Sequence, residues 1–314
     1  MPDMRALDGL LLLDKPVGCT SNGVLQQVRR LFGAKKAGHT GSLDPSATGM
    51  LPICFGEGTK LCAYLLDAEK TYEVEGVLGQ STDTEDADGE IVAEGPVPAI
   101  TQAQMHQTVQ GFLGHSMQVP PAYSAIKRNG VRAHKLARKG VEVQLEPRAI
   151  EVKSIELLAF SADRFSLRLC VSKGTYIRSI VRDIGDSFGC GAHVSRLRRV
   201  SVSPFEQQRM YSIDEIQQIE NKDSLLLAVD EVISDWQSLT LDSERAMLFR
   251  HGAKPQIDYA VETTSASADT AEDQSGGPSK DLLRIYDPSE KFLGLGKISD
   301  GRLETVRIIG GQLQ

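Results

Sequence analysis

The chain has 314 residues, of which 40% are hydrophobic and 25% charged, as is usual for a globular protein with a sizeable core and about two domains. The longest apolar run near the N-terminus, residues 10–13, is far too short to cross a membrane. No signal peptide is visible, so we expect a cytoplasmic protein that does not bind membranes. Five cysteines without a C-x-x-C pair argue against a zinc cage or a disulfide framework.

The first predicted elements are a buried strand over residues 9–13 and a helix with Ser21 as its N-cap, which Gly33 ends. A loop with three glycines follows at residues 38–50. Residues 61–65 favour a short helix, and residues 72–78 alternate between apolar and polar side chains, as a half-buried strand does.

A helix capped by Thr101 is predicted to end near Gly114. Residues 115–148 are basic and interrupted by proline and glycine, which indicates a surface insertion. The clearest strand of the chain covers residues 165–171, and it precedes a helix over residues 177–188.

Residues 194–202 predict a further strand, and Ser212 opens a capping box before a helix. We place a first domain at residues 1–237 and a small β-rich domain at residues 238–314. The second domain contains residues 258–281, an acidic stretch rich in Ser, Thr and Ala that is typical of a flexible loop.

Charge is unevenly distributed, although the formal net charge is −7. Residues 127–148 carry seven basic and two acidic side chains, and residues 173–200 carry six and two. Residues 81–94 hold six acidic side chains and no basic one. Segregated charge of this kind can steer a polyanion such as a nucleic acid to one face. The alternative is that the basic runs are ordinary solvated faces.

Asp44 is the candidate catalytic residue of the glycine-containing loop. It stands between Leu43 and Pro45, and the proline disfavours a helical backbone at Asp44. A carboxylate on such a pre-shaped loop can serve as a nucleophile or a general base. It can also simply accept hydrogen bonds from nearby N–H groups in an Asx-turn, and the tripeptide alone favours that reading.

Several separated motifs together resemble the TruB family of tRNA pseudouridine synthases, which convert the T-loop uridine at position 55 of tRNA to pseudouridine. The resemblance is firm over residues 9–215 and loose beyond. Its motifs are Asp14-Lys15-Pro16 with Thr20-Ser21, the run GHTGSLDPSATGMLPICFGEGTK from residue 38, KTY at 70–72, GQSTDT at 79–84, PPAYSAIK at 120–127, SKGTYIRS at 172–179, and GAHV with LRR at 191–199.

This resemblance implies an α+β pseudouridine synthase fold, with a mixed, largely antiparallel sheet flanked by helices. A small β-barrel-like domain of the PUA type, which binds RNA, would follow at residues 238–314, although the acidic stretch departs from the family pattern. Residues 115–148 would clamp the T-arm stem-loop of tRNA. The resemblance also implies a monomer that needs no protein partner, no cofactor and no metal.

The family motifs give roles to three catalytic candidates. Asp44 would be the nucleophile, and Arg178 the counter-ion that keeps it ionised and aims it. The Tyr72 ring would stack on the uracil, and its hydroxyl would accept the C5 proton. From the residues alone, Tyr72 is equally an ordinary core tyrosine of a strand, and Arg178 could face solvent.

Five further residues are assigned to substrate binding by the same resemblance. Tyr176 would lie near the nucleophile, and Leu197 would touch the base, although each could be plain core. His39 would fill the place of the flipped uridine. Lys15 and Lys127 would contact phosphate or serve as scaffold.

Two other functions remain open from the sequence. The chain could be a tRNA-binding folding chaperone in which catalysis is secondary, or a guide-RNA-dependent pseudouridine synthase that works within a ribonucleoprotein. The intact Asp44, Tyr72 and Arg178 count against lost catalysis, and the PPAYSAIK insertion favours the stand-alone enzyme.

Overall fold

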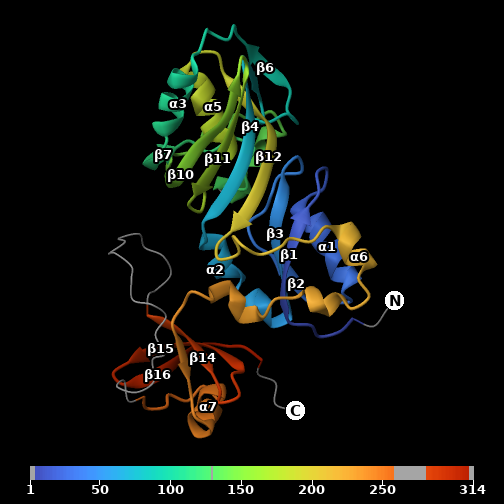
Figure 1. Ribbon diagram of the computed structural model, residues 1–314, viewed down its shortest axis with the longest axis vertical. Helices are drawn as coiled ribbons and strands as arrows, with labels where there is room; N and C mark the ends of the chain where they lie inside the picture. The colour runs from blue at the N-terminus through green and yellow to red at the C-terminus, as the bar shows by residue number, and fades with distance from the viewer. Residues whose placement is uncertain (1–3, 129, 258–280, 311–314) are drawn as a thin grey trace.

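The computed structural model describes residues 4–128, 130–257 and 281–310. A long mixed sheet runs through the larger part of the molecule (Figure 1). Its strand order is β1-β3-β12-β4-β11-β10-β7, with β2 paired on β3, and only the β3–β12 pairing is parallel. The strands are β1 Gly9–Lys15, β2 Ala37–His39, β3 Thr48–Phe55, β4 Lys70–Leu78, β7 Gly114–Gln118, β10 Arg148–Ser161, β11 Arg164–Val171 and β12 Ala192–Val202.

Helices cover the two ends of this sheet differently. At one end α3 and α5 lie on one side of β4, β10 and β11, and the other side is exposed (Figure 1). At the other end β1 and β3 are buried on both faces, so their sequences are almost continuously apolar. The helices are α1 Ser21–Leu31, α2 Cys62–Asp67, α3 Gln102–Gln110, α4 Ala133–Ala137, α5 Ile177–Ser187, α6 Ile213–Gln218 and α7 Ser243–Arg250.

Strand β1 shows how the double burial arises. Leu10 and Leu12 join a cluster with α2 and with the 3₁₀ helix Val229–Ile233, which lies much later in the chain. Leu11 and Leu13 join a different cluster, with α1 and α6. Successive side chains of a strand point to opposite faces, so one apolar run fills two cores. The short 3₁₀ helices Gly56–Lys60 and Lys222–Leu225 complete this end of the sheet.

A second sheet forms the C-terminal part, in the order β13-β14-β15-β16. It packs with α7 around its own core, and Leu295 and Ile309 also join the cluster that contains Leu10 and Leu12. Among the described residues no strand pairing closes it into a barrel, so the predicted barrel-like shape is seen as an open sheet. The strands are β13 Ser238–Thr240, β14 Leu282–Tyr286, β15 Phe292–Ser299 and β16 Arg302–Ile308.

Most predicted elements are present with shifted ends. The Thr101 and Ser212 capping boxes are confirmed. Residues 115–118 were expected in the insertion but belong to β7, which is an edge strand with exposed side chains and therefore lacks an apolar pattern. The expected acidic loop falls almost wholly on residues 258–280, which lie outside the described residues.

The insertion itself is short and exposed. It carries the hairpin of β8 Lys127–Arg128 and β9 Val131–Arg132, followed directly by α4. A second small hairpin, β5 Gln80–Thr82 with β6 Ile91–Glu94, extends from the end of β4. No helix in the described parts of the chain is long and apolar enough to cross a membrane.

We predict that Gly49→Ala strongly destabilises the fold. Gly49 has φ +101°, and an added Cβ would lie 2.1 Å from the carbonyl oxygen of Arg199 on the neighbouring strand. We expect the free energy of unfolding to fall by at least about 3 kcal/mol in urea titrations. Gly18→Ala is the control, because Gly18 has a similar φ of +80° but open space around its Cβ, so only the backbone strain of about 1–2 kcal/mol applies. Equal losses in the two variants would contradict the close packing of β3 on β12.

Candidate active site

Asp44 lies on the loop between β2 and β3, at the rim of a small cleft. The cleft is lined by four segments of the chain: Asp44 and Ser46, Asp86 and Ala87, Arg178 of α5, and residues 194–197 of β12. The Asp44 carboxylate is 44% exposed, and its Oδ2 lies 3.1 Å from Nε of Arg178. The structure therefore brings the two sequence-predicted groups together as an ion pair open to solvent on one side.

Ser21 fixes the backbone just before Asp44. Its hydroxyl accepts a hydrogen bond from the Leu43 N–H at 2.8 Å and donates to the Leu43 carbonyl at 3.0 Å. The predicted role of Ser21 as N-cap is wrong, because Thr20 caps α1 by accepting from the Gly23 N–H. Ser21 is instead the first residue of the helix, and this position aims its side chain at the Asp44 loop.

Lys15 holds the loop just after Asp44. Its side chain is fully buried, and Nζ donates to the carbonyls of Pro16 at 2.9 Å, Pro45 at 3.3 Å and Ala47 at 2.7 Å. Burial lowers the Lys15 pKa, although nearby carboxylate and thiol groups oppose the shift. Of the two expected roles, this placement supports the scaffold contact, since the ammonium is not available to phosphate.

Arg199 was named only as part of a motif, yet it supports the same loop. It is 1% exposed and donates from Nε to Met50 O at 2.7 Å and from Nη2 to Gly41 O at 2.8 Å. Lys70 packs beside it, because a Cβ added to Gly41 would meet both side chains. The loop is thus held by buried cations that bind its carbonyls.

Arg178 is buried on α5 with its side chain only 6% exposed. Besides the ion pair with Asp44, it donates from Nη1 to Thr84 O at 2.6 Å and from Nη2 to Tyr123 O at 3.0 Å. All three guanidinium nitrogens therefore have acceptors, which fixes the plane of the group and the direction from which it approaches Asp44.

Asp86 is a second carboxylate at this guanidinium, and our sequence reading missed it. Its Oδ2 lies 3.7 Å from Nη1 of Arg178, and its side chain is 8% exposed. Burial raises the Asp86 pKa, while the Thr84 hydroxyl and Arg178 act in the opposite direction. The sequence placed Asp86 in an acidic run that we interpreted only by its net charge. The signal that could have identified it is the family motif that begins with GQSTDT and continues through Asp88-Gly89, because Asp86 lies within it.

Leu197 lines the cleft, whereas the two predicted tyrosines are not among its lining residues. Tyr72 is on β4, 9% exposed, and packs in the same core cluster as Leu43 and Ala47 of the Asp44 loop. Tyr176 precedes α5, and burial raises the pKa of its hydroxyl. Leu197 is half-buried on β12 and lines the cleft directly.

His39 and Lys127 differ from these residues. His39 ends β2, half-buried, with its Nδ1 shielded from solvent and without a hydrogen-bond partner. Burial and the nearby Arg199 lower its pKa, which favours a neutral ring. Lys127 is exposed on the β8–β9 hairpin and does not line the cleft.

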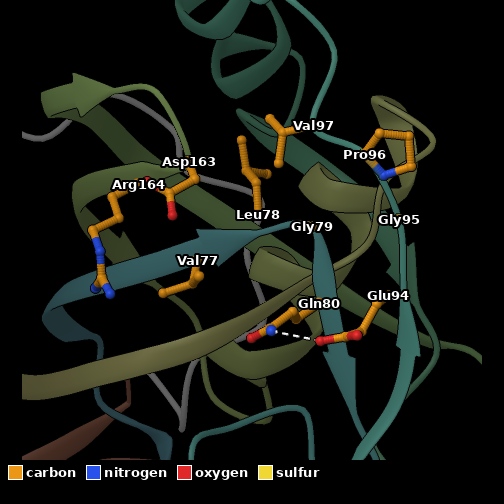
Figure 2. A pocket seen from close by; sticks show the side chains of 10 residues that line it. All are labelled: Val77, Leu78, Gly79, Gln80, Glu94, Gly95, Pro96, Val97, Asp163 and Arg164. Carbon is orange, nitrogen blue, oxygen red and sulfur yellow. Dashed lines mark hydrogen bonds between the residues drawn. The ribbon is translucent and has the colours of Figure 1, made fainter.

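A larger, open groove lies at the far end of β4 (Figure 2). It is lined by residues 77–80, 94–97, Asp163 and Arg164, and Gln80 donates to Glu94 at 2.8 Å. It contains neither Asp44 nor Arg178, so the smaller cleft is the better candidate for chemistry. In the described ranges 4–128, 130–257 and 281–310, no three His, Cys, Asp or Glu side chains form a group that could hold a metal ion.

Comparison with known proteins places the chain in a family. The profile "TruB family pseudouridylate synthase (N terminal domain)" matches residues 29–177, and two TruB C-terminal profiles match residues 178–239 and 238–309. The tRNA pseudouridine synthase B of Stutzerimonas stutzeri (strain A1501) is 42% identical over 312 residues, which cover 97% of this chain and 96% of the relative. The enzyme of that name from Yersinia pestis (strain Pestoides F) is 40% identical over 319 residues, with 97% and 93% coverage.

Solved structures agree in fold. A Cbf5-Nop10-Gar1 complex contains a chain with a TM-score of 0.72 and 24% identity, matched over 96% of this chain and 84% of that one. An H/ACA RNP bound to a substrate RNA containing 2′-deoxyuridine gives a TM-score of 0.71 and 22% identity, over 96% and 85% of the two chains.

We predict that Lys70 gives the folded chain a specific pH dependence. Burial lowers its pKa from 10.5 to about 8, so between these values the unfolded chain binds more protons than the folded one. Stability contributed at this site therefore rises with pH over that window, by up to about 3 kcal/mol. Urea unfolding of the wild type and Lys70→Met between pH 8 and 10.5 should show this rise in the difference between them. Plots of unfolding free energy against pH that stay parallel for the two proteins would contradict the lowered pKa of Lys70.

Proposed function

Because the chain belongs to the TruB family of pseudouridylate synthases, we propose that it isomerises the T-loop uridine at position 55 of tRNA to pseudouridine. The observation that carries this proposal is the Asp44–Arg178 ion pair in a cleft bordered by Leu197. The relatives at 40–42% identity are named tRNA pseudouridine synthase B, which supports tRNA as the substrate. As a tRNA-modifying enzyme the protein would work in the cytoplasm.

The reaction breaks the N1–C1′ bond of the uridine, turns the uracil and joins C5 to C1′. The C5 proton leaves and N1 gains one, so protons balance and nothing is oxidised. Asp44 acts as the nucleophile that enables cleavage, and the Arg178 guanidinium pairs with its carboxylate and orients it in the cleft. The Tyr72 ring stacks on the detached base, and its hydroxyl accepts the C5 proton.

Access to the uridine requires that the base leaves its stack. Enzymes that act on a base in folded nucleic acid flip it into a pocket, at a cost of a few kcal/mol. The neutral, half-buried His39 ring is suited to occupy the vacated place, and Leu197 and Tyr176 shape the pocket around the base. Lys15 contributes by holding the Asp44 loop.

The insertion supplies the RNA clamp in this proposal. Arg132, Lys135 and Arg138 are exposed and have no ion pair within the described part of the chain, and Lys127 is exposed beside them. Exposed cations of this kind bind backbone phosphates. The enzyme would act as a monomer with tRNA alone, without a guide RNA or a protein partner.

We predict that Asp44→Asn abolishes turnover while tRNA affinity stays within a few-fold. The amide cannot act as a nucleophile, but it retains the shape of the loop. Tritium release from tRNA transcript labelled at uridine C5 measures turnover, and filter binding measures affinity. Asp163→Asn, an exposed aspartate outside the cleft, is the control and should keep full activity. Substantial turnover by Asp44→Asn would exclude the nucleophile role, and an inactive wild type that binds tRNA would favour the folding chaperone.

We predict that reversing Arg132, Lys135 and Arg138 to glutamate weakens tRNA binding and flattens its salt dependence. Each lost phosphate contact lowers the slope of log affinity against log salt by roughly 0.7–0.9, so the slope should fall by about 2–3. Binding isotherms at several salt concentrations test this. Arg30→Glu on the exposed side of α1 is the control. An unchanged slope in the triple variant would show that the insertion is not the clamp.

A further inference from the structure

Glu85 stands in sequence between Thr84 and Asp86, which both contact Arg178. Thr84 provides its carbonyl and Asp86 its carboxylate to the guanidinium, so the turn that contains all three residues determines where Arg178 can lie. The Glu85 side chain is directed at α5, where Oε2 accepts a hydrogen bond from the Ser179 hydroxyl at 3.0 Å. Ser179 directly follows Arg178, so this contact ties the turn to the helix at the catalytic position.

Arg182, one turn further along α5, forms an ion pair with the same carboxylate. The Glu85 side chain is 13% exposed and that of Arg182 is 23% exposed, so the pair is largely shielded from water. Burial raises the Glu85 pKa, and Arg182 counteracts this shift. A shielded carboxylate that loses its partner is costly, so the two groups hold each other in place.

The backbone at Glu85 confirms that the turn is held under constraint. Glu85 has a φ of +62°, a left-handed backbone conformation that residues other than glycine and asparagine seldom adopt. The turn is also attached to β12, because Val194 N–H donates to Glu85 O at 3.0 Å and Ala87 N–H donates to Val194 O at 2.9 Å. Such strain persists where surrounding contacts fix the residue, and it is common at functional sites.

Arg182 extends the same network to the insertion. Its Nη2 donates to Val119 O at 3.1 Å, and its Nε donates to Asp183 at 2.9 Å. Arg178 makes the matching contact with Tyr123 O, four residues further along the insertion. Arg178 and Arg182 therefore connect the acidic turn, residues 82–88, to the root of the insertion, residues 119–123.

We propose that Glu85 is a positioning residue for catalysis: through Ser179 and Arg182 it fixes the turn of residues 82–88 against α5, and so presents Thr84 O and Asp86 to Arg178. This inference rests on the proposed function. Without Glu85 the turn can move away from the helix, Arg178 loses its fixed acceptors, and its alignment with Asp44 loosens. Small misalignments of this kind slow the chemical step far more than they weaken binding of a large substrate.

The test compares Glu85→Ala and Glu85→Gln with the wild type in single-turnover tritium release at saturating enzyme. We expect Glu85→Ala to lower the rate constant about tenfold while the tRNA Kd changes less than twofold. Glu85→Gln keeps one acceptor oxygen for Arg182, and its amide N–H can donate to the Ser179 hydroxyl, so it should restore most of the rate. Glu85→Ala combined with Arg182→Ala should be no slower than the slower single variant, because both act through one network.

Glu57→Ala is the matched control, since Glu57 is also a partly shielded acid paired with a lysine, Lys60, outside the cleft. It should lower Tm without lowering the rate constant. The inference is overturned if Glu85→Ala reacts at the wild-type rate, or if Glu85→Gln regains none of the rate that Glu85→Ala loses. It is also overturned if the loss of rate in each variant only follows its loss of Tm, as a purely structural role predicts. Should Glu85→Ala fail to fold, the Glu85→Gln and Arg182→Ala rate constants decide in the same way. An inactive wild type would refute the proposed function, and this inference with it.

Discussion

The site depends on one buried positive charge, the Arg178 guanidinium. Removing a charge from water is unfavourable unless every donor finds an acceptor, so the surrounding chain has to supply them. They come from three places that are distant in sequence: Asp44 on the β2–β3 loop, Thr84 and Asp86 on the acidic turn, and Tyr123 in the insertion. Satisfying a single arginine therefore assembles the cleft. It also makes the orientation of the Asp44 carboxylate a property of the whole site, because the guanidinium cannot turn toward one acceptor without leaving another.

The Asp44 loop follows the same logic with backbone acceptors. Its carbonyls are bound by Lys15 and Arg199, both almost completely buried, and Ser21 satisfies both backbone groups of Leu43. The loop has little regular secondary structure, yet the carbonyls of Gly41, Leu43, Pro45 and Ala47 all accept hydrogen bonds from buried side chains. A loop held in this way can keep an exposed carboxylate in one place, which a nucleophile requires. Lys15 and Arg199 hold the loop because a buried cation is costly unless acceptors surround it, and the carbonyls of the loop are those acceptors.

The sequence could predict the residues whose chemistry is local. Asp44 and Arg178 were found because their motifs are unusual, and the Thr101 and Ser212 caps because capping follows fixed spacing. It could not reveal Asp86, whose role depends on a guanidinium 92 positions away in the chain. Arg199 received no role of its own for a related reason: a cation in a sequence suggests a surface, and only the fold shows that carbonyls surround it. For Lys15 the sequence left phosphate contact and scaffold both open, and the fold favours the scaffold. The edge strand β7 escaped notice because one covered side chain leaves no periodicity to read.

The uneven distribution of charge explains how a chain of net charge −7 can carry an exposed basic segment. Of the acidic run at residues 81–94, Glu85 is paired with Arg182, Asp86 with Arg178, and Asp83 accepts from the Tyr123 hydroxyl. Two of its six acidic side chains are therefore paired with arginines of α5. Arg132, Lys135 and Arg138 on the insertion are exposed and have no such partners among the residues described. These acids hold the base of the insertion in place, while the cations of the insertion stay free for phosphate. A polyanion that approaches the insertion therefore meets a local positive field, although the chain as a whole is acidic.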